Sequence, residues 1–204
     1  KLAQAFRDRL EGVRGVVAVS AAEECPGLAF NSATWTHDGR ELHFNGFRVG
    51  AAFLDAMGLR LVSGRWLDPA LDGADEAVVV NEAFVRQLGA DAVVGQRLPE
   101  LPRPGESATR SPTVVGVVGD FHFTDIRRAI GPVVVELEDT ARGKYGLGYR
   151  YLLVRLHPEH QAAGLTAVER AWRLLARDVP FVHHRLRERL DTYHADTVRW
   201  TRLV

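Results

Sequence analysis

Hydrophobic and polar residues alternate along this chain with two different periods. Over 2–13 and 157–180, apolar residues recur every three or four positions, which predicts amphipathic helices that bury one face. Elsewhere, short apolar runs between turn residues predict strands. The predicted strands lie at 16–20, 34–37, 41–49, 59–62, 77–80, 113–118, 133–137, 151–156 and 181–183, with short helices at 51–57 and 82–88. The pattern therefore predicts an α+β fold.

Local turn signals predict several element boundaries. Asp38-Gly39 is a strong hairpin dipeptide between two predicted strands. Asn81 stands where the N-cap of the helix at 82–88 belongs, and Gly89 is the expected stop of that helix.

Two segments lack the pattern of a regular element. The segment 99–112 holds four prolines, and we expect it to be a disordered loop. The segment 139–149 carries three glycines and is predicted to be a flexible connection. The β–α–β order predicted at 41–62 recurs at 151–183, which we interpret as an echo of the pattern and not as a proven repeat.

Amphipathic helices are predicted at both ends of the chain. The last spans about 185–204, with one apolar stripe formed by Leu186, Leu190, Tyr193, Thr197, Trp200 and Val204. No glycine or proline ends it, so we expect it to continue in a longer parent protein. We expect the same of the helix at 2–13. Side by side, the two would form a stalk, which is expected of a domain inserted between two membrane spans. Alternatively, both are surface helices that cover a sheet.

The composition argues against some functions. The 204 residues carry 26 basic and 26 acidic side chains, a formal net charge of +0. We therefore expect no nucleic-acid partner, because a basic field is needed to bind the phosphate backbone. Cys25 is the only cysteine, which excludes an internal disulfide. No run approaches the roughly 18 apolar residues that a membrane span needs.

The common catalytic and metal-binding motifs are absent from the sequence. There is no HExxH, no zinc-type Cys/His spacing and no Gly-x-Ser-x-Gly, and 116–119 lacks the Gly-Lys-Ser/Thr of a phosphate loop. In His157-Pro-Glu-His160, the step of three could place two imidazoles on one helix face, but the proline is typical of a helix start. His183 and His184 point to opposite faces of a predicted strand. We predict no enzyme, no metal and no cofactor in this domain.

Three stretches stand in an order that resembles a known family. The first is 47–65, FRVGAAFLDAMGLRLVSGR. The second is 77–98, with Val-Asn-Glu, Leu-Gly and a Gly-Gln-Arg-Leu segment in place of the usual lysine step. The third is 114–123, VVGVVGDFHF, followed by a proline. Together they resemble the extracytoplasmic (periplasmic) core domain of MacB/FtsX-type ABC-transporter permeases. The residues that match the family motifs are Gly64, Arg65, Asn81, Glu82, Gly95, Gly116, Asp120, Phe121 and Pro132.

We expect these matching residues to have structural roles. Gly64 and Gly95 supply turns that a Cβ would hinder. Asn81 caps a helix, which is worth about 1 kcal/mol relative to alanine. Asp120 ends a strand and accepts backbone N–H bonds in a turn.

The resemblance implies two subdomains and a place in the cell envelope. A porter-like β–α–β subdomain with stalk helices is built from 1–69 and 129–204, and a smaller α/β lobe is inserted at 70–128. The parent protein is a bacterial inner-membrane permease, and this domain lies in the periplasm or at the outer face of the membrane.

The resemblance also implies partners. ATP is bound by a separate nucleotide-binding domain or subunit, and the extracytoplasmic domain transmits ATP-driven conformational change in a dimeric transporter. The expected partners are a periplasmic adaptor, or a lipoprotein, peptide or hydrophobic cargo. The alternative is a free-standing α/β ligand-binding or metal-dependent hydrolytic domain, which would carry one deep pocket lined by polar groups.

Overall fold

A computed structural model describes residues 2–72, 76–89, 92–105, 109–124, 127–137 and 149–191. Its elements follow in the order α1 (Leu2–Leu10), β1 (Val16–Ala22), β2 (Asn31–His37), β3 (Arg40–Val49), α2 (Phe53–Met57), β4 (Leu61–Gly64), β5 (Ala77–Asn81), α3 (Glu82–Leu88), β6 (Leu101–Pro102), β7 (Thr109–Arg110), β8 (Thr113–Val118), β9 (Val133–Leu137), β10 (Tyr151–Leu156), the 3₁₀ helix η1 (Pro158–His160) and α4 (Gln161–Leu175). Residues 186–191 are also helical.

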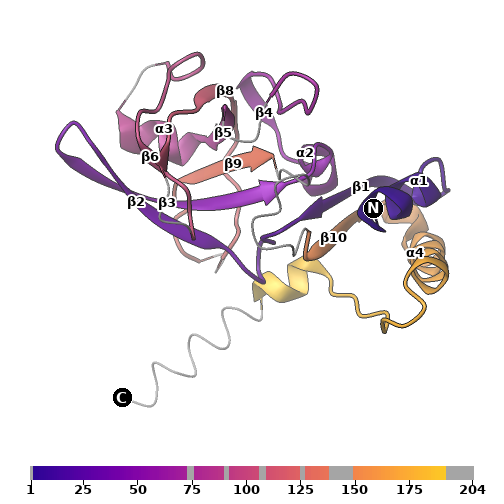
Figure 1. Cartoon of the computed structure of the whole chain (residues 1–204). Coiled ribbons are helices and arrows are strands. Elements are labelled where there is room, and N and C mark those ends of the chain that lie inside the picture. The colour runs from indigo at the N-terminus through magenta and orange to yellow at the C-terminus, as the bar shows by residue number, and fades with distance from the viewer. Residues whose placement is uncertain are drawn as a thin grey trace.

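The centre of the molecule is one mixed sheet of eight strands (Figure 1). The strand order is β10-β1-β3-β9-β5-β8-β4, and β2 pairs with β3 beside this path. The β3–β9 and β5–β8 pairs are parallel, whereas β1–β10, β2–β3, β5–β9 and β4–β8 are antiparallel. A large mixed sheet with few helices confirms the predicted α+β class.

The β2–β3 hairpin follows the sequence prediction closely. Asp38 and Gly39 both have positive φ, 49° and 73°, as a tight two-residue hairpin turn requires. The flanking pair His37 and Arg40 is in register, and the pairing continues without a shift to Asn31.

The sheet is buried on both faces in its middle, as the alternating residues of β9 show. Val133 and Val135 belong to one hydrophobic cluster, which also contains Phe53 of α2. Val134 belongs to a cluster on the opposite face, together with Phe84 of α3. Both faces are thus covered, one by α2 and its neighbours and the other by α3 and the β6–β7 hairpin.

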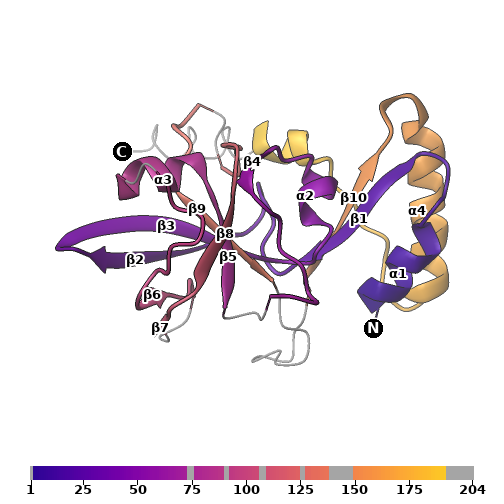
Figure 2. The same ribbon diagram turned by 90° about the horizontal axis from the view of Figure 1, so that it is seen from above.

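A third hydrophobic cluster packs α1 and α4 against β1 and β10. Its buried members are Phe6, Leu10, Val19, Val168 and Ala171. Figure 2 shows the two helices side by side at one end of the molecule, away from the β2–β3 hairpin. The ring of Phe6 meets that of Trp172 edge-on, with 6.1 Å between their centroids.

The strand predicted at 181–183 is absent, and the disorder predicted for 99–112 does not extend to the described residues 99–105 and 109–112. Residues 181–183 form no strand, so the predicted β–α–β unit at 151–183 lacks its last element. The described residues of 99–112 are ordered, because β6 and β7 pair there and Leu101 is fully buried. The predicted flexible connection at 139–149 lies outside the described residues apart from Tyr149.

The sheet is continuous across the predicted lobe boundaries. β5 and β8 belong to the predicted lobe at 70–128, yet β5 pairs with β9 and β8 pairs with β4, both of which belong to the remaining chain. The division into this lobe and a subdomain of 1–69 and 129–204 stays a prediction.

The two terminal helices lie on different sides of the molecule as far as the structure describes them. α1 packs on α4, whereas the helical residues 186–191 lie against the turn at Gly27, where a Cβ would come within 3.3 Å of Leu190. Figures 1 and 2 agree on this separation. Residues 192–204 lie outside the described residues, so the stalk stays a prediction. Within the described ranges, no helix has both the length and the apolar character needed to cross a membrane.

Candidate functional site

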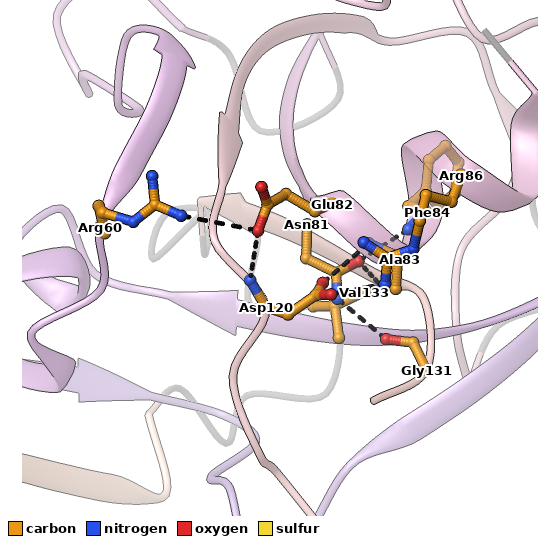
Figure 3. A network of polar contacts seen from close by, with 9 residues as sticks. All are labelled: Arg60, Asn81, Glu82, Ala83, Phe84, Arg86, Asp120, Gly131 and Val133. Carbon is orange, nitrogen blue, oxygen red and sulfur yellow. Dashed lines mark hydrogen bonds and ion pairs between the residues drawn. The ribbon is translucent and has the colours of Figure 1, made fainter. Parts of the chain in front are cut away.

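Three of the motif residues, Asn81, Glu82 and Asp120, meet where β5 and β8 end. The two strands are parallel neighbours, so their carboxyl ends lie at the same edge of the sheet. β9 runs antiparallel to β5, which brings its first residue, Val133, to this edge as well. We use the name motif junction for the set of residues drawn in Figure 3: Arg60, Asn81, Glu82, Ala83, Phe84, Arg86, Asp120, Gly131 and Val133.

The side chain of Asn81 joins three elements. It is fully buried, and its Oδ1 accepts hydrogen bonds from the backbone N–H groups of Phe84, at 3.0 Å, and Val133, at 2.8 Å. Its Nδ2 donates to the carbonyl of Gly131 at 2.9 Å. The structure thus confirms the predicted N-cap of α3. The same side chain also ties the start of β9 to the end of β5.

The carboxylates of Asp120 and Glu82 connect the residues after β8 to the first turn of α3. Asp120 accepts hydrogen bonds from the backbone N–H of Ala83 at 2.8 Å and from the guanidinium of Arg86 at 2.6 Å. Glu82 accepts from the backbone N–H of Asp120 at 3.2 Å, and the same oxygen lies 3.8 Å from Arg60. Each carboxylate therefore faces one guanidinium, and both stand at a helix start, where negative charge is favourable.

Gly64 and Gly116 allow β4 and β8 to approach more closely than side chains would permit. They are paired in the antiparallel register. A Cβ at Gly64, where φ is +71°, would lie 2.8 Å from the Cα of Gly116, and a Cβ at Gly116 would overlap the carbonyl oxygen of Arg65. Because these obstacles are backbone atoms, no side-chain rotation relieves them.

The Gly116→Ala variant is expected to lose about 3 kcal/mol of unfolding free energy or more, because its methyl group forces β4 away from β8. Chemical denaturation of the variant and the wild type measures the loss. The matched control is Gly119→Ala, whose Cβ would meet the flexible side chain of Arg60 first, at 3.3 Å. A similar loss in both variants would contradict the close approach as the cause.

Arg65 anchors the loop that follows β4. Its guanidinium donates two hydrogen bonds to the buried carboxylate of Asp72, at 2.6 and 2.7 Å. The same carboxylate accepts from the backbone N–H of Asp68 at 2.8 Å. The hydrogen bonds from Arg65 hold the pKa of Asp72 below its ordinary value. The family-motif arginine therefore has a clear local role.

The remaining motif residues have contacts of their own, Gly95 at the start of β8 and the other two near the motif junction. Gly95 has φ +87° and donates its backbone N–H to a carbonyl of β8 at 2.8 Å, in keeping with the expected turn. The ring of Phe121 packs 6.2 Å from that of Phe47. The carbonyl of Pro132 accepts from the backbone N–H of Asn45 at 2.9 Å.

A second polar group, which sequence reasoning missed, lies beneath the β6–β7 hairpin. We call Glu24, Arg48, Arg103, Arg110 and Glu136 the buried charge cluster. Arg110 forms an ion pair with the carboxylate of Glu136, which is only 3% exposed, and Arg103 lies 3.6 Å from it. On the neighbouring strand, Arg48 stands in register with Glu136 and pairs with Glu24 at 2.6 Å.

The buried charge cluster connects the described residues of the proline-rich segment to the sheet. Arg103 and Arg110 both come from this segment, and they bring positive charge to Glu136 in the sheet. Burial raises the pKa of Glu136, and the charges of Arg110, Arg103 and Arg48 act in the opposite direction. The only sign of the buried charge cluster in the sequence is Glu136, a glutamate inside the apolar run at 133–137.

The lone cysteine is not prepared for nucleophilic chemistry. Cys25 is buried, and burial raises its pKa to about 11. The thiolate, which is the reactive form, is therefore scarce at neutral pH. The motif junction joins β5, β8 and β9 to α3, and the buried charge cluster joins the β6–β7 hairpin to the sheet.

Comparison with known proteins identifies the family. A family model described as the MacB-like periplasmic core domain matches residues 1–171. This chain belongs to that family. Among curated proteins, no sequence matches it significantly.

Two solved structures share the fold. The periplasmic region of MacB from Actinobacillus actinomycetemcomitans superposes with a TM-score of 0.56 at 18% identity, covering 86% of this chain and 75% of that one. The extracellular domain of the noncanonic ABC-type transporter YknZ from Gram-positive bacteria gives a TM-score of 0.56 at 17% identity, covering 86% of this chain and 82% of that one. The resemblance inferred from the sequence motifs is thereby confirmed.

Proposed function

We propose that this chain is the extracytoplasmic domain of an ABC-transporter permease and relays ATP-driven motion of the transporter to a partner or cargo. Membership of the MacB-like periplasmic core domain family supports this proposal, as does the shared fold with two transporter domains. The structural observation that carries the mechanical part is a narrow joint in the sheet.

The joint lies between β1 and β3. β1 pairs with β10 from Val16 to Ala22, but with β3 it shares the single register pair Ala22 and Val49. Beyond this pair, two backbone hydrogen bonds cross the joint, from the N–H of Gly50 to the carbonyl of Ala21 at 2.8 Å and from the N–H of Glu23 to the carbonyl of Arg48 at 2.9 Å. The sheet is therefore held by few backbone contacts at this position.

Each side of the joint has a hydrophobic cluster of its own, and α2 bridges the two sides through contacts with β1 and β10. On one side, α1 and α4 cover β1 and β10 around the cluster that contains Phe6 and Val168. On the other side, β3 continues into the remaining strands, with the clusters around Val135 and Phe84. Two bodies whose cores are largely separate can rotate about a short connection, which is the usual basis of hinge motion. Ala22 of β1 and Leu153 of β10, which pack in the cluster around Val135, would shift against α2 during such a rotation.

Charged side chains cross the joint as well. Arg48 of β3 pairs with Glu23 at 2.7 Å and with Glu24 at 2.6 Å, and both glutamates follow directly after β1. The backbone N–H of Glu23 donates to the carbonyl of Arg48 at 2.9 Å. These contacts stabilise one angle between the two sides of the joint. A change of that angle during a transport cycle would have to break or strain them.

The proposal includes the partners that the family implies. ATP binds a separate nucleotide-binding domain or subunit of the parent permease, which works as a dimer. The domain then acts on a periplasmic adaptor, or on a lipoprotein, peptide or hydrophobic cargo. The free-standing ligand-binding or hydrolytic alternative has less support, because the family match extends over residues 1–171.

A disulfide across the joint tests the proposal. A Cβ at Gly50 would lie 3.3 Å from the Oγ of Ser20, so the double variant Ser20→Cys/Gly50→Cys is placed to form a disulfide. In the parent transporter reconstituted with its nucleotide-binding subunit, oxidation is expected to slow ATP hydrolysis about fivefold, equivalent to about 1 kcal/mol on the barrier. Reduction should restore the rate.

The matched control is a disulfide within one body. Thr34 and His43 are directly opposite each other on β2 and β3 and are exposed. Oxidation of Thr34→Cys/His43→Cys should leave ATP hydrolysis unchanged. Unchanged hydrolysis in the oxidised Ser20→Cys/Gly50→Cys transporter would contradict the proposal, and so would equal slowing in both variants.

A further inference from the structure

We propose that His157, Glu159 and His160 form a binding site for a divalent transition-metal ion such as Zn²⁺. Their candidate ligand atoms all lie within 4.8 Å of one another. The three residues connect the end of β10 to the start of α4 through η1. The site is separate from the motif junction, and it does not depend on the proposed transport role.

The backbone places the two imidazoles together. η1 is a 3₁₀ helix, in which residues three apart eclipse one another. The backbone N–H of His160 donates to the carbonyl of His157 at 3.0 Å and closes the turn, while Pro158 fixes φ at its first position. The N–H of His157 is in turn held by the carbonyl of Gly15 at 2.9 Å. As a result the rings stack, with centroids 5.3 Å apart.

After small side-chain rotations, the distances between the candidate ligand atoms suit a single metal ion. Zn²⁺ lies about 2.1 Å from imidazole nitrogen and carboxylate oxygen, so two ligands on a tetrahedral ion are about 3.4 Å apart. His157 and Glu159 are exposed and free to close this gap. In the described part of the chain, no hydrogen bond or ion pair holds the Glu159 carboxylate elsewhere. Two imidazoles and one carboxylate form a ligand set that zinc commonly takes, with water in the remaining position.

Metal binding competes with one existing hydrogen bond. The Nδ1 of His157 accepts from the backbone N–H of Glu159 at 3.3 Å and so caps η1. An ion on Nδ1 takes this lone pair, and an ion on Nε2 requires a proton on Nδ1, so either arrangement displaces the cap. The bond is long and exposed and contributes little. We therefore expect micromolar affinity.

The expected consequence is local stabilisation of the body formed by α1, β1, β10 and α4. An ion that binds only the folded chain shifts the unfolding equilibrium towards the folded state. The ion would link His157, the first residue after β10, to η1, the turn that precedes α4. Binding requires neutral imidazoles.

Titration calorimetry of the metal-free chain with zinc chloride tests the site. The wild type should bind one ion and unfold at a higher temperature in its presence. His157→Asn, Glu159→Gln and His160→Asn should each weaken binding about tenfold or more, which corresponds to about 1.4 kcal/mol. His157→Asn is the most informative variant, because asparagine retains an N-cap acceptor and removes the imidazole.

The matched control is His183→Asn, which alters an exposed histidine whose ring stacks on Phe181 at 5.3 Å. It should bind zinc as the wild type does. The proposal is overturned if the wild type takes up no zinc at millimolar concentration, or if binding survives in all three site variants. Loss of binding in His183→Asn would overturn it too. Should either histidine variant fail to fold, as judged by circular dichroism without zinc, the exposed Glu159→Gln variant decides the matter.

Discussion

Replacing Glu136 with alanine is expected to lower the free energy of unfolding by about 3–5 kcal/mol, the usual cost of breaking a buried ion pair. The substitution removes the carboxylate that balances Arg110 and Arg103 beneath the β6–β7 hairpin. Their guanidinium groups then stay in a buried environment or leave it with the hairpin. Denaturant unfolding followed by circular dichroism measures the loss.

An exposed glutamate in an ion pair provides the control. Glu169 pairs with Arg173 at 2.7 Å, one turn apart on the surface of α4. Glu169→Ala should cost about 0.5 kcal/mol or less, because an exposed pair of this kind contributes little. If Glu136→Ala costs no more than Glu169→Ala, the buried charge cluster does not hold the hairpin in place.

Asn81→Ala is expected to lower the free energy of unfolding by about 3–4 kcal/mol, well beyond the loss of an ordinary helix cap. The larger loss arises because the side chain also serves Val133 and Gly131. Without it, the backbone N–H groups of Val133 and Phe84 lose their acceptor inside the protein. Equilibrium denaturation of the variant measures the effect.

The matched control is Asn45→Ala, the same substitution on β3, which β9 separates from β5. The side chain of Asn45 is half-buried and makes one long hydrogen bond, 3.4 Å, to the carbonyl of Pro132. Its loss should cost about 1 kcal/mol. Equal losses at the two positions would show that the three contacts of Asn81 do not act together.

The elements that the sequence predicted well are those with local causes. The hairpin at Asp38-Gly39 and the cap at Asn81 depend on residues next to one another in the chain, and the structure contains both. The apolar run at 133–137 likewise predicted a strand, and β9 occupies these residues in the structure. The family motifs also identified residues that meet in space, because Asn81, Glu82 and Asp120 all belong to the motif junction.

The features that the sequence did not reveal depend on contacts between distant segments. Four prolines in 99–112 suggested disorder, since nothing local shows that Arg103 and Arg110 meet Glu136. The close approach of Gly64 to Gly116 depends in the same way on the order of the strands. Residues 181–183 have a strand-like composition, but they pair with no strand in the part of the chain that the structure describes, so local propensity alone gave the wrong assignment there.

The proposed relay role depends on motion at the β1–β3 joint, between the body of α1, β1, β10 and α4 and the remaining strands. The most direct measurement is the rate of ATP hydrolysis by the parent transporter carrying Ser20→Cys/Gly50→Cys, compared before and after reduction of the disulfide. We predict slow hydrolysis while the disulfide is closed and full recovery once it opens. A rate that does not depend on the state of this disulfide, with its formation verified by mass spectrometry, would contradict the account.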